Sequence, residues 1–169
     1  MPDPVETLNL LVEAAVAVAG FSGVVIILGR RAIGEWSQIE RERFLNLLLT
    51  SFMVLFLSLL ALVLLHAGTP AATTWRIGSG LWSIIVIPRI TVTIRDYVRV
   101  PREDSERVSV AVVATILGIS VIIVLLSFWN AFALKEFWPF LAAQVWLFAA
   151  ACYLFARLLL SPDRGGQGA

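Results

Sequence analysis

Long apolar runs separated by short polar stretches make up most of this chain. Five of the runs are long enough to cross the hydrocarbon core of a bilayer, which needs about 20 helical residues; they cover residues 8–28, 44–66, 73–94, 108–129 and 138–160. The third run is the most polar, so an alternative with four spans, in which this segment is interfacial or re-entrant, stays open. The pattern predicts an all-α integral membrane bundle of five transmembrane helices over residues 1–160, followed by a disordered tail over 161–169.

The composition points to the same class of protein. Hydrophobic residues make up 59% of the 169 positions and charged residues 15%. A soluble domain of this size has too high a surface-to-volume ratio to bury so much apolar surface. The net charge of +1 gives no reason to expect a nucleic-acid partner. The acidic start, which precedes the first apolar run, argues against a cleaved signal peptide, so we expect the first span to be retained.

The arginines fall in alternate loops and therefore predict an orientation. They cluster after the first and third spans and at the C-terminal end: Arg30, Arg31, Arg41 and Arg43; Arg95, Arg99, Arg102 and Arg107; Arg157 and Arg164. The positive-inside rule places these segments in the cytoplasm. The N-terminus is then outside and the C-terminus cytoplasmic.

Local signals mark where the helices begin and bend. Residues 37–40 (Ser-Gln-Ile-Glu) fit a capping box ahead of the second helix. Thr69 is expected to be the N-cap of the third helix with Pro70 in its first turn, and Pro139 is expected early in the fifth. Pro88 lies inside the third helix, where it removes one backbone hydrogen bond and predicts a kink.

The first span carries small residues on two faces, which predicts close helix packing. The residues concerned are Ala15, Ala19, Gly20 and Gly23. Small residues spaced four apart let two membrane helices approach closely. Packing within one bundle is the favoured interpretation, and an oligomeric or pore-lining role is the alternative.

Glu13 suggests a polar cluster near the outer side of the membrane. Arg76 lies at a comparable predicted depth, and three more residues could join the pair: Asn9, Gln144 and His66. Carboxylates inside a membrane are costly and normally face a partner or water. One interpretation is a polar vestibule that admits ions; the other, which the residues favour, is a structural Glu13–Arg76 ion pair.

Three arginines near the inner end of the third helix form a second candidate site. Arg89, Arg95 and Arg99 could bind an anionic lipid headgroup, although such side chains more often extend to the interface without a specific ligand. The chain has one histidine and one cysteine and contains no phosphate-binding loop, zinc-binding helix or nucleophile elbow. We therefore expect neither an enzyme nor a cofactor or metal site.

The first third of the chain carries a family resemblance. Residues 19–23 (Ala-Gly-Phe-Ser-Gly), 29–31 (Gly-Arg-Arg), Trp36 and 42–43 (Glu-Arg) resemble small uncharacterised bacterial multi-pass inner-membrane proteins. The resemblance implies a bacterial inner membrane and carries no activity. The leading functional hypothesis is a homo-oligomeric conduit for ions or small solutes. The alternatives are a non-catalytic accessory or scaffold subunit that binds another membrane protein and, less favoured, a lipid-binding or lipid-transport protein.

Overall fold

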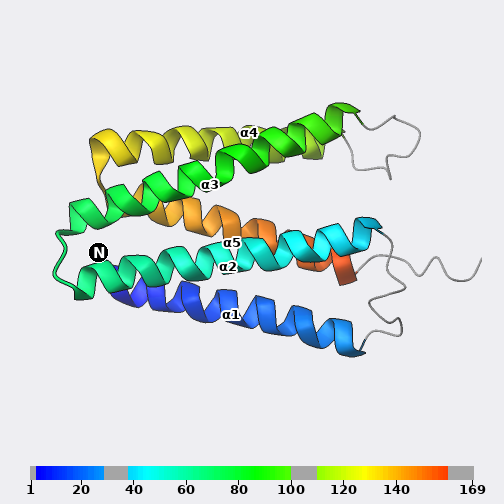
Figure 1. The fold of residues 1–169 in the computed structure, drawn as a ribbon, viewed down its shortest axis with the longest axis horizontal. Coiled ribbons are helices and arrows are strands. Elements are labelled where there is room, and N and C mark those ends of the chain that lie inside the picture. Colours follow the sequence, from blue (N-terminus) through cyan, green and yellow to red (C-terminus); the bar gives the residue numbers. More distant parts are fainter. Residues whose placement is uncertain (1–2, 29–37, 100–109, 160–169) are drawn as a thin grey trace, which may run out of the picture. The chain divides into compact units, whose positions relative to one another are not determined.

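The computed structural model describes residues 3–28, 38–99 and 110–159, apart from some side chains near the ends of these segments. The described chain is all-α (Figure 1). Its elements are α1 (Pro4–Leu28), α2 (Gln38–His66), α3 (Ala71–Arg99), α4 (Val110–Trp129), the π-helix η2 (Asn130–Leu134) and α5 (Phe137–Leu159). The predicted fold class is thereby confirmed at this level, while the predicted tail over 161–169 lies outside the described residues.

Four stretches among the described residues are long and apolar enough to cross a membrane. They are Pro4–Val24, Phe44–His66, Ala114–Leu134 and Phe137–Arg157. Helix α3 is as long as α2, at 29 residues, but is not among these stretches. Its four arginines, its aspartate and its threonine and serine hydroxyls lower its hydropathy. Four of the five predicted spans therefore have the expected helices. The third predicted span, residues 73–94, stays a prediction.

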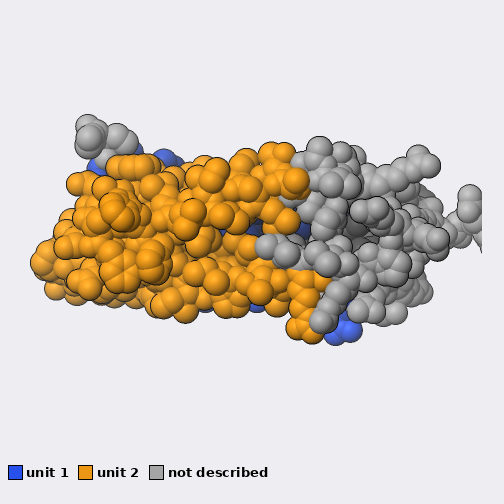
Figure 2. Space-filling model, turned by 90° about the horizontal axis from the view of Figure 1, so that it is seen from above, with its two compact units in different colours: residues 1–59, 147–169 blue, residues 60–146 orange. Residues whose placement is uncertain are grey.

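The chain divides into two compact units, coloured separately in Figure 2. Unit 1 contains α1, the first part of α2 and the second part of α5; it comprises residues 1–59 and 147–169. Unit 2 covers residues 60–146 and so contains the end of α2, all of α3 and α4, and the first part of α5. The prediction of one bundle over residues 1–160 stays a prediction.

Side-chain and backbone caps fix several helix ends. The Val5 amide donates to Asp3 Oδ1 at 3.0 Å, so Asp3 caps α1 and Pro4 occupies the first helical position. The Thr74 amide donates to the Pro70 carbonyl at 3.1 Å, which puts the start of α3 one residue later than predicted. Pro139 is the third residue of α5, and α3 continues as a helix through Pro88.

Helix α4 ends at Trp129, as its predicted span does, but no loop follows it directly. The chain continues through the π-turn of η2, and the Lys135 amide closes it by donating to the Asn130 carbonyl at 3.0 Å. Lys135 itself adopts a left-handed conformation with φ 56°. The apolar sequence of residues 131–134 explains the extension, because these side chains gain nothing from a solvated loop and the first charges come at Lys135 and Glu136.

An aromatic contact joins α3 to the start of α5 inside unit 2. The Trp75 ring lies 4.8 Å from that of Phe137 and 5.9 Å from that of Phe140, measured between centroids. Phe140 is fully buried, and a Cβ built on Gly78 would lie 2.7 Å from its ring. The absent side chain at Gly78 therefore makes the space that the Phe140 ring fills.

Gly78 and Gly80, which flank Ser79 in the sequence, allow a test of this packing. We expect Gly78→Ala to destabilise the protein by about 1–3 kcal/mol, because the new methyl overlaps a ring that Trp75 holds in place. Gly80→Ala should instead be neutral or stabilise by up to about 1 kcal/mol, because its Cβ would meet the Ala131 Cβ at 3.9 Å, an ordinary contact. Thermal unfolding in mild detergent measures both. Equal losses would contradict the assigned role of Gly78.

Candidate functional site

Unit 2 contains a set of buried polar side chains on three facing elements and α5. They are Thr74, Ser79 and Ser83 of α3, Ser127 of α4, Asn130 of η2 and Gln144 of α5. Each has at most 3% of its surface exposed. None of the six is ionisable, so this interior offers hydroxyl and amide dipoles. Such groups suit hydrogen bonding to neutral polar partners better than the storage of charge.

Asn130 makes the most extensive polar contact in unit 2. Its Nδ2 donates to Ser79 Oγ at 2.8 Å and to the Glu136 carbonyl at 3.0 Å, and its Oδ1 accepts from the Glu136 amide at 2.9 Å. The amide therefore pairs with both backbone groups of one residue and still reaches α3. We call Asn130, Ser79 and Glu136 the Asn130 clamp.

The clamp depends on the local geometry of the α4–α5 hairpin. The π-turn places the Asn130 carbonyl opposite the Lys135 amide, and the left-handed Lys135 turns the chain so that the Glu136 backbone faces the Asn130 side chain. π-turns are often found at functional positions. Here the turn has a clear structural role, because it brings three elements together around one side-chain amide.

A second polar contact joins α4 and α5 further along the hairpin. Trp146 Nε1 donates to Ser120 Oγ at 3.1 Å, and Ser120 Oγ donates in turn to the Ile116 carbonyl at 2.8 Å. The clamp and this contact together hold the two arms of the hairpin at two levels.

The predicted polar cluster divides between the two units. Gln144 is fully buried in unit 2, whereas Arg76 and His66 are exposed residues of the same unit. His66 Nδ1 lies 2.8 Å from the Leu62 carbonyl of its own helix. Asn9 and Glu13 are exposed residues of unit 1. The Glu13–Arg76 ion pair stays a prediction.

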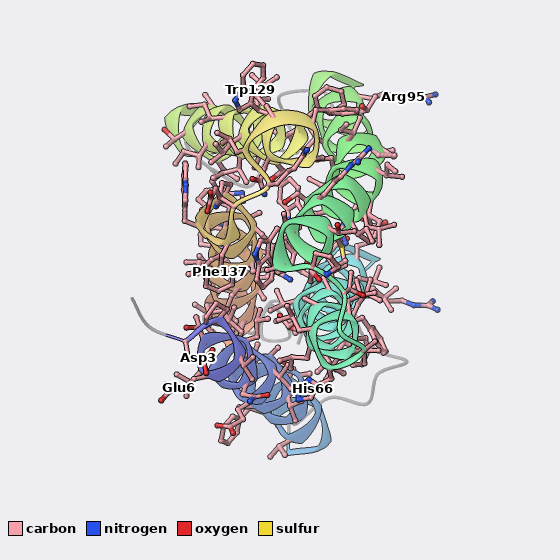
Figure 3. The ribbon with its side chains drawn as sticks, turned by 90° about the vertical axis from the view of Figure 1, so that its left-hand side faces the viewer. Asp3, Glu6, His66, Arg95, Trp129 and Phe137 are labelled. Atoms are coloured by element: carbon pink, nitrogen blue, oxygen red, sulfur yellow. The ribbon has the colours of Figure 1, made fainter. Side chains whose placement is uncertain are left out.

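Helix α1 has a buried face and an opposite exposed face. Leu8, Ala15 and Ser22 are buried at seven-residue spacing, with at most 1% of their surface exposed. At 100° per residue the other side carries exposed polar and small residues, namely Glu6, Asn9, Glu13, Ala17 and Gly20, together with the exposed apolar side chains of Leu10 and Val24. Figure 3 shows the labelled Glu6 side chain projecting away from its helix.

Glu13 is the tenth residue of helix α1 and belongs to the candidate span Pro4–Val24. The helix begins at Pro4, four residues before the predicted span 8–28. The earlier start follows from the Asp3 cap, which allows the helix to include Pro4. A carboxylate on the exposed face of a membrane-spanning helix is costly in lipid.

The predicted packing residues of α1 occupy different surroundings. Ala15 is 1% exposed, Ala19 and Gly23 are half-buried and Gly20 is exposed. A Cβ built on Gly20 or Gly23 meets no atom within 4 Å. Among the described side chains, Ala15 therefore packs within the chain, while the space around the two glycines is open to a neighbour.

The predicted lipid-headgroup arginines are only partly described. Arg89 is half-buried in α3, and Arg95 is exposed and projects outward in Figure 3. The Arg99 side chain lies outside the described residues. Among the described residues, no three His, Cys, Asp or Glu side chains group so as to hold a metal ion.

Comparisons with known proteins do not assign this chain to a family. No family model, curated protein or solved structure matches the chain. The functional argument therefore depends on the residues and their positions.

Sequence reasoning missed the Asn130 clamp. A polar residue directly after an apolar run is typical of a loop, and the predicted fourth span accordingly ends at Trp129. The available signal was the apolar stretch 131–134, which indicates that the helix continues and that Asn130 lies inside it. Its partner Ser79 is 51 residues away in the sequence, and no sequence pattern identifies such a pair.

The Asn130 clamp predicts a graded set of stability losses. Asn130→Ala removes three hydrogen bonds and leaves the Glu136 amide without that acceptor, so we expect a loss of about 2–3 kcal/mol. Asn130→Asp retains the acceptor but loses both amide donations. Ser79→Ala removes one hydrogen bond, so we expect it to lower the stability by about 1 kcal/mol. Unfolding in detergent under identical conditions ranks the three variants. A Ser79→Ala loss as large as that of Asn130→Ala would contradict the assignment of most of the energy to the backbone pair.

Proposed function

We propose that this protein is a five-span inner-membrane protein that associates with copies of itself through the exposed face of α1 and forms a conduit for small cations. The observation that carries the proposal is the position of Glu13. It lies within a candidate span, on a face that the described chain leaves exposed.

The energetic argument is that this face needs a cover other than lipid. Insertion of an acidic residue at the centre of a membrane helix costs about 2.5–3.5 kcal/mol on the insertion scale. The span of α1 is also the least buried of the four candidate spans. Ala17 and Gly20 beside Glu13 offer little steric hindrance to an approaching helix.

A second copy of the chain is the occupant that best explains the chemistry of this face. In a closed ring, symmetry brings the same helix of each copy towards the axis. Glu13 and Glu6 then repeat around the axis with Asn9 between them. Rings of carboxylates are a recurrent lining of cation pores, and this ring would replace lipid around Glu13 with water and permeating ions.

The proposal also includes α3 as a membrane span, which brings the number of spans to five. The N-terminus is then outside and the C-terminus cytoplasmic. At 1.5 Å per residue, the 29 residues of α3 extend about 43 Å, enough to cross a bilayer. Within unit 2, α3 lies alongside the candidate span of α4 (Figure 1). A helix packed lengthwise against a spanning helix shares its environment. The exposed Trp129 and Trp138 near the charged tip of the α4–α5 hairpin suit an interfacial position for that tip.

Self-association through α1 can be tested with two alanines of the same helix. In a Cys152→Ser background, we expect Ala17→Cys to form disulfide-linked dimers in oxidised native membranes, because Ala17 is on the exposed face. Ala15→Cys should stay monomeric, because Ala15 is 1% exposed. Leu49→Cys on α2, where Leu49 is 54% exposed, controls for random collision and should link much less. Monomers with Ala17→Cys would contradict self-association through this face.

Conduction is tested by cation flux into liposomes that contain the purified protein. We expect flux above that of empty liposomes and a decrease of about tenfold with Glu13→Gln, equivalent to about 1.4 kcal/mol of lost attraction for the cation. Glu136→Gln removes the same charge at the hairpin tip, where only the backbone of Glu136 takes part in the clamp, and should leave the flux unchanged.

The outcomes separate this proposal from its rivals. Absence of flux for several cations, together with Ala17→Cys links to a different protein of the host membrane, would replace the conduit by an accessory subunit. Flux that is equal for the native chain and Glu13→Gln would keep a conduit but remove Glu13 from its path.

A further inference from the structure

A buried polar layer lies one helical turn from the Asn130 clamp, between α3 and α4. Trp82 and Ser127 are fully buried, and Ser83 is 3% exposed. Among the described residues, neither Trp82 Nε1 nor Ser127 Oγ has a hydrogen-bond partner. Such atoms are uncommon in proteins, because a buried donor without a partner loses its hydration and gains nothing in return.

The register of the two helices puts these atoms at one level. Ser79 is bonded to Asn130, and a Cβ on Gly80 would lie 3.9 Å from that of Ala131. The end of the α4 segment thus meets the beginning of α3, so the two run antiparallel. One turn further, Trp82 and Ser83 of α3 come opposite Ser127 of α4.

The parallel pair of α3 and α5 brings a further polar residue to this level. Trp75 contacts Phe137, and two turns along both helices the corresponding positions are Trp82 and Gln144. Gln144 is also fully buried. The layer is therefore bordered by polar side chains from α3, α4 and α5.

We infer that this layer is a binding site for ordered water. The Trp82 indole N–H donates to the water oxygen, and the Ser127 hydroxyl bonds to the same molecule. Ser83 Oγ already donates to the Ser79 carbonyl at 2.9 Å and retains lone pairs that accept from water. Three partners match the usual coordination of buried waters, which make about three hydrogen bonds each.

Water is the ligand that this chemistry selects. The layer offers one obligate donor and hydroxyls that can donate or accept, with no ionisable side chain among Trp82, Ser83, Ser127 and Gln144. A charged ligand would lack a counter-charge there. The site is separate from the α1 face and does not depend on the proposed conduit.

The experiment is a nuclear magnetic resonance measurement on the full chain with ¹⁵N-labelled tryptophan in nanodiscs. The Trp82 indole signal is assigned by its loss in Trp82→Phe or, if that variant does not fold, by elimination with the other tryptophans. We expect a cross-relaxation peak between the Trp82 indole proton and water, opposite in sign to chemical exchange in a rotating-frame spectrum. Trp146 is the internal control and should lack this peak, because its N–H donates to Ser120 Oγ.

Ser127→Ala gives the second measurement. We expect it to weaken or remove the Trp82–water peak and to shift the Trp82 indole proton upfield, whereas Ser120→Ala leaves the Trp82 signal unchanged. No Trp82–water peak in the native chain, with peaks present for the exposed Trp129 and Trp138, would overturn the inference. An upfield shift in Ser127→Ala without a native water peak would also overturn it, since it indicates a direct bond between the two side chains.

Discussion

Hydrogen bonding within an apolar medium is the constraint on which the rest of this structure depends. Lipid offers no donors or acceptors, so a polar side chain within a span must find its partner in protein or in enclosed water. Asn130 meets this requirement by pairing with both backbone groups of Glu136 and with Ser79 Oγ. The same bonds determine how the α4–α5 hairpin turns and where it meets α3.

The interior of unit 2 is built in successive levels from this point. At the level of Trp75, aromatic rings fill the space that Gly78 leaves free. The next levels along α3 are the Asn130 clamp and then the polar layer of Trp82 and Ser127. Further along the α4–α5 hairpin, the hydrogen bond from Trp146 to Ser120 joins its two helices. Apolar side chains alone would let such helices slide or rotate at little cost, whereas directional bonds at fixed levels select one register.

Helix α1 differs from unit 2 because it leaves its most polar side chains exposed. Its buried line contains Leu8, Ala15 and Ser22, while Glu13 and Asn9 are left on the exposed side. Unit 2 thus buries Asn130 and Ser79 in mutual hydrogen bonds, whereas α1 leaves Glu13 and Asn9 exposed. This contrast, more than any individual residue, is the reason for proposing an assembly whose hydrophilic path lies between copies and not inside unit 2.

The sequence by itself determined the helical class, the four apolar spans found in the structure and most helix bounds, because run length and charge placement depend on the solvent and not on neighbouring helices. Only the tertiary structure decided which side of each helix is buried. Helices apolar around most of their circumference carry no strong amphipathic pattern, so the sequence could not show which of the two small-residue faces of α1 is buried, or that Gln144 lies in the interior. Asn130 shows the same limit, because its role depends on partners 6 and 51 residues away, and helical periodicity contains no information on contacts between helices.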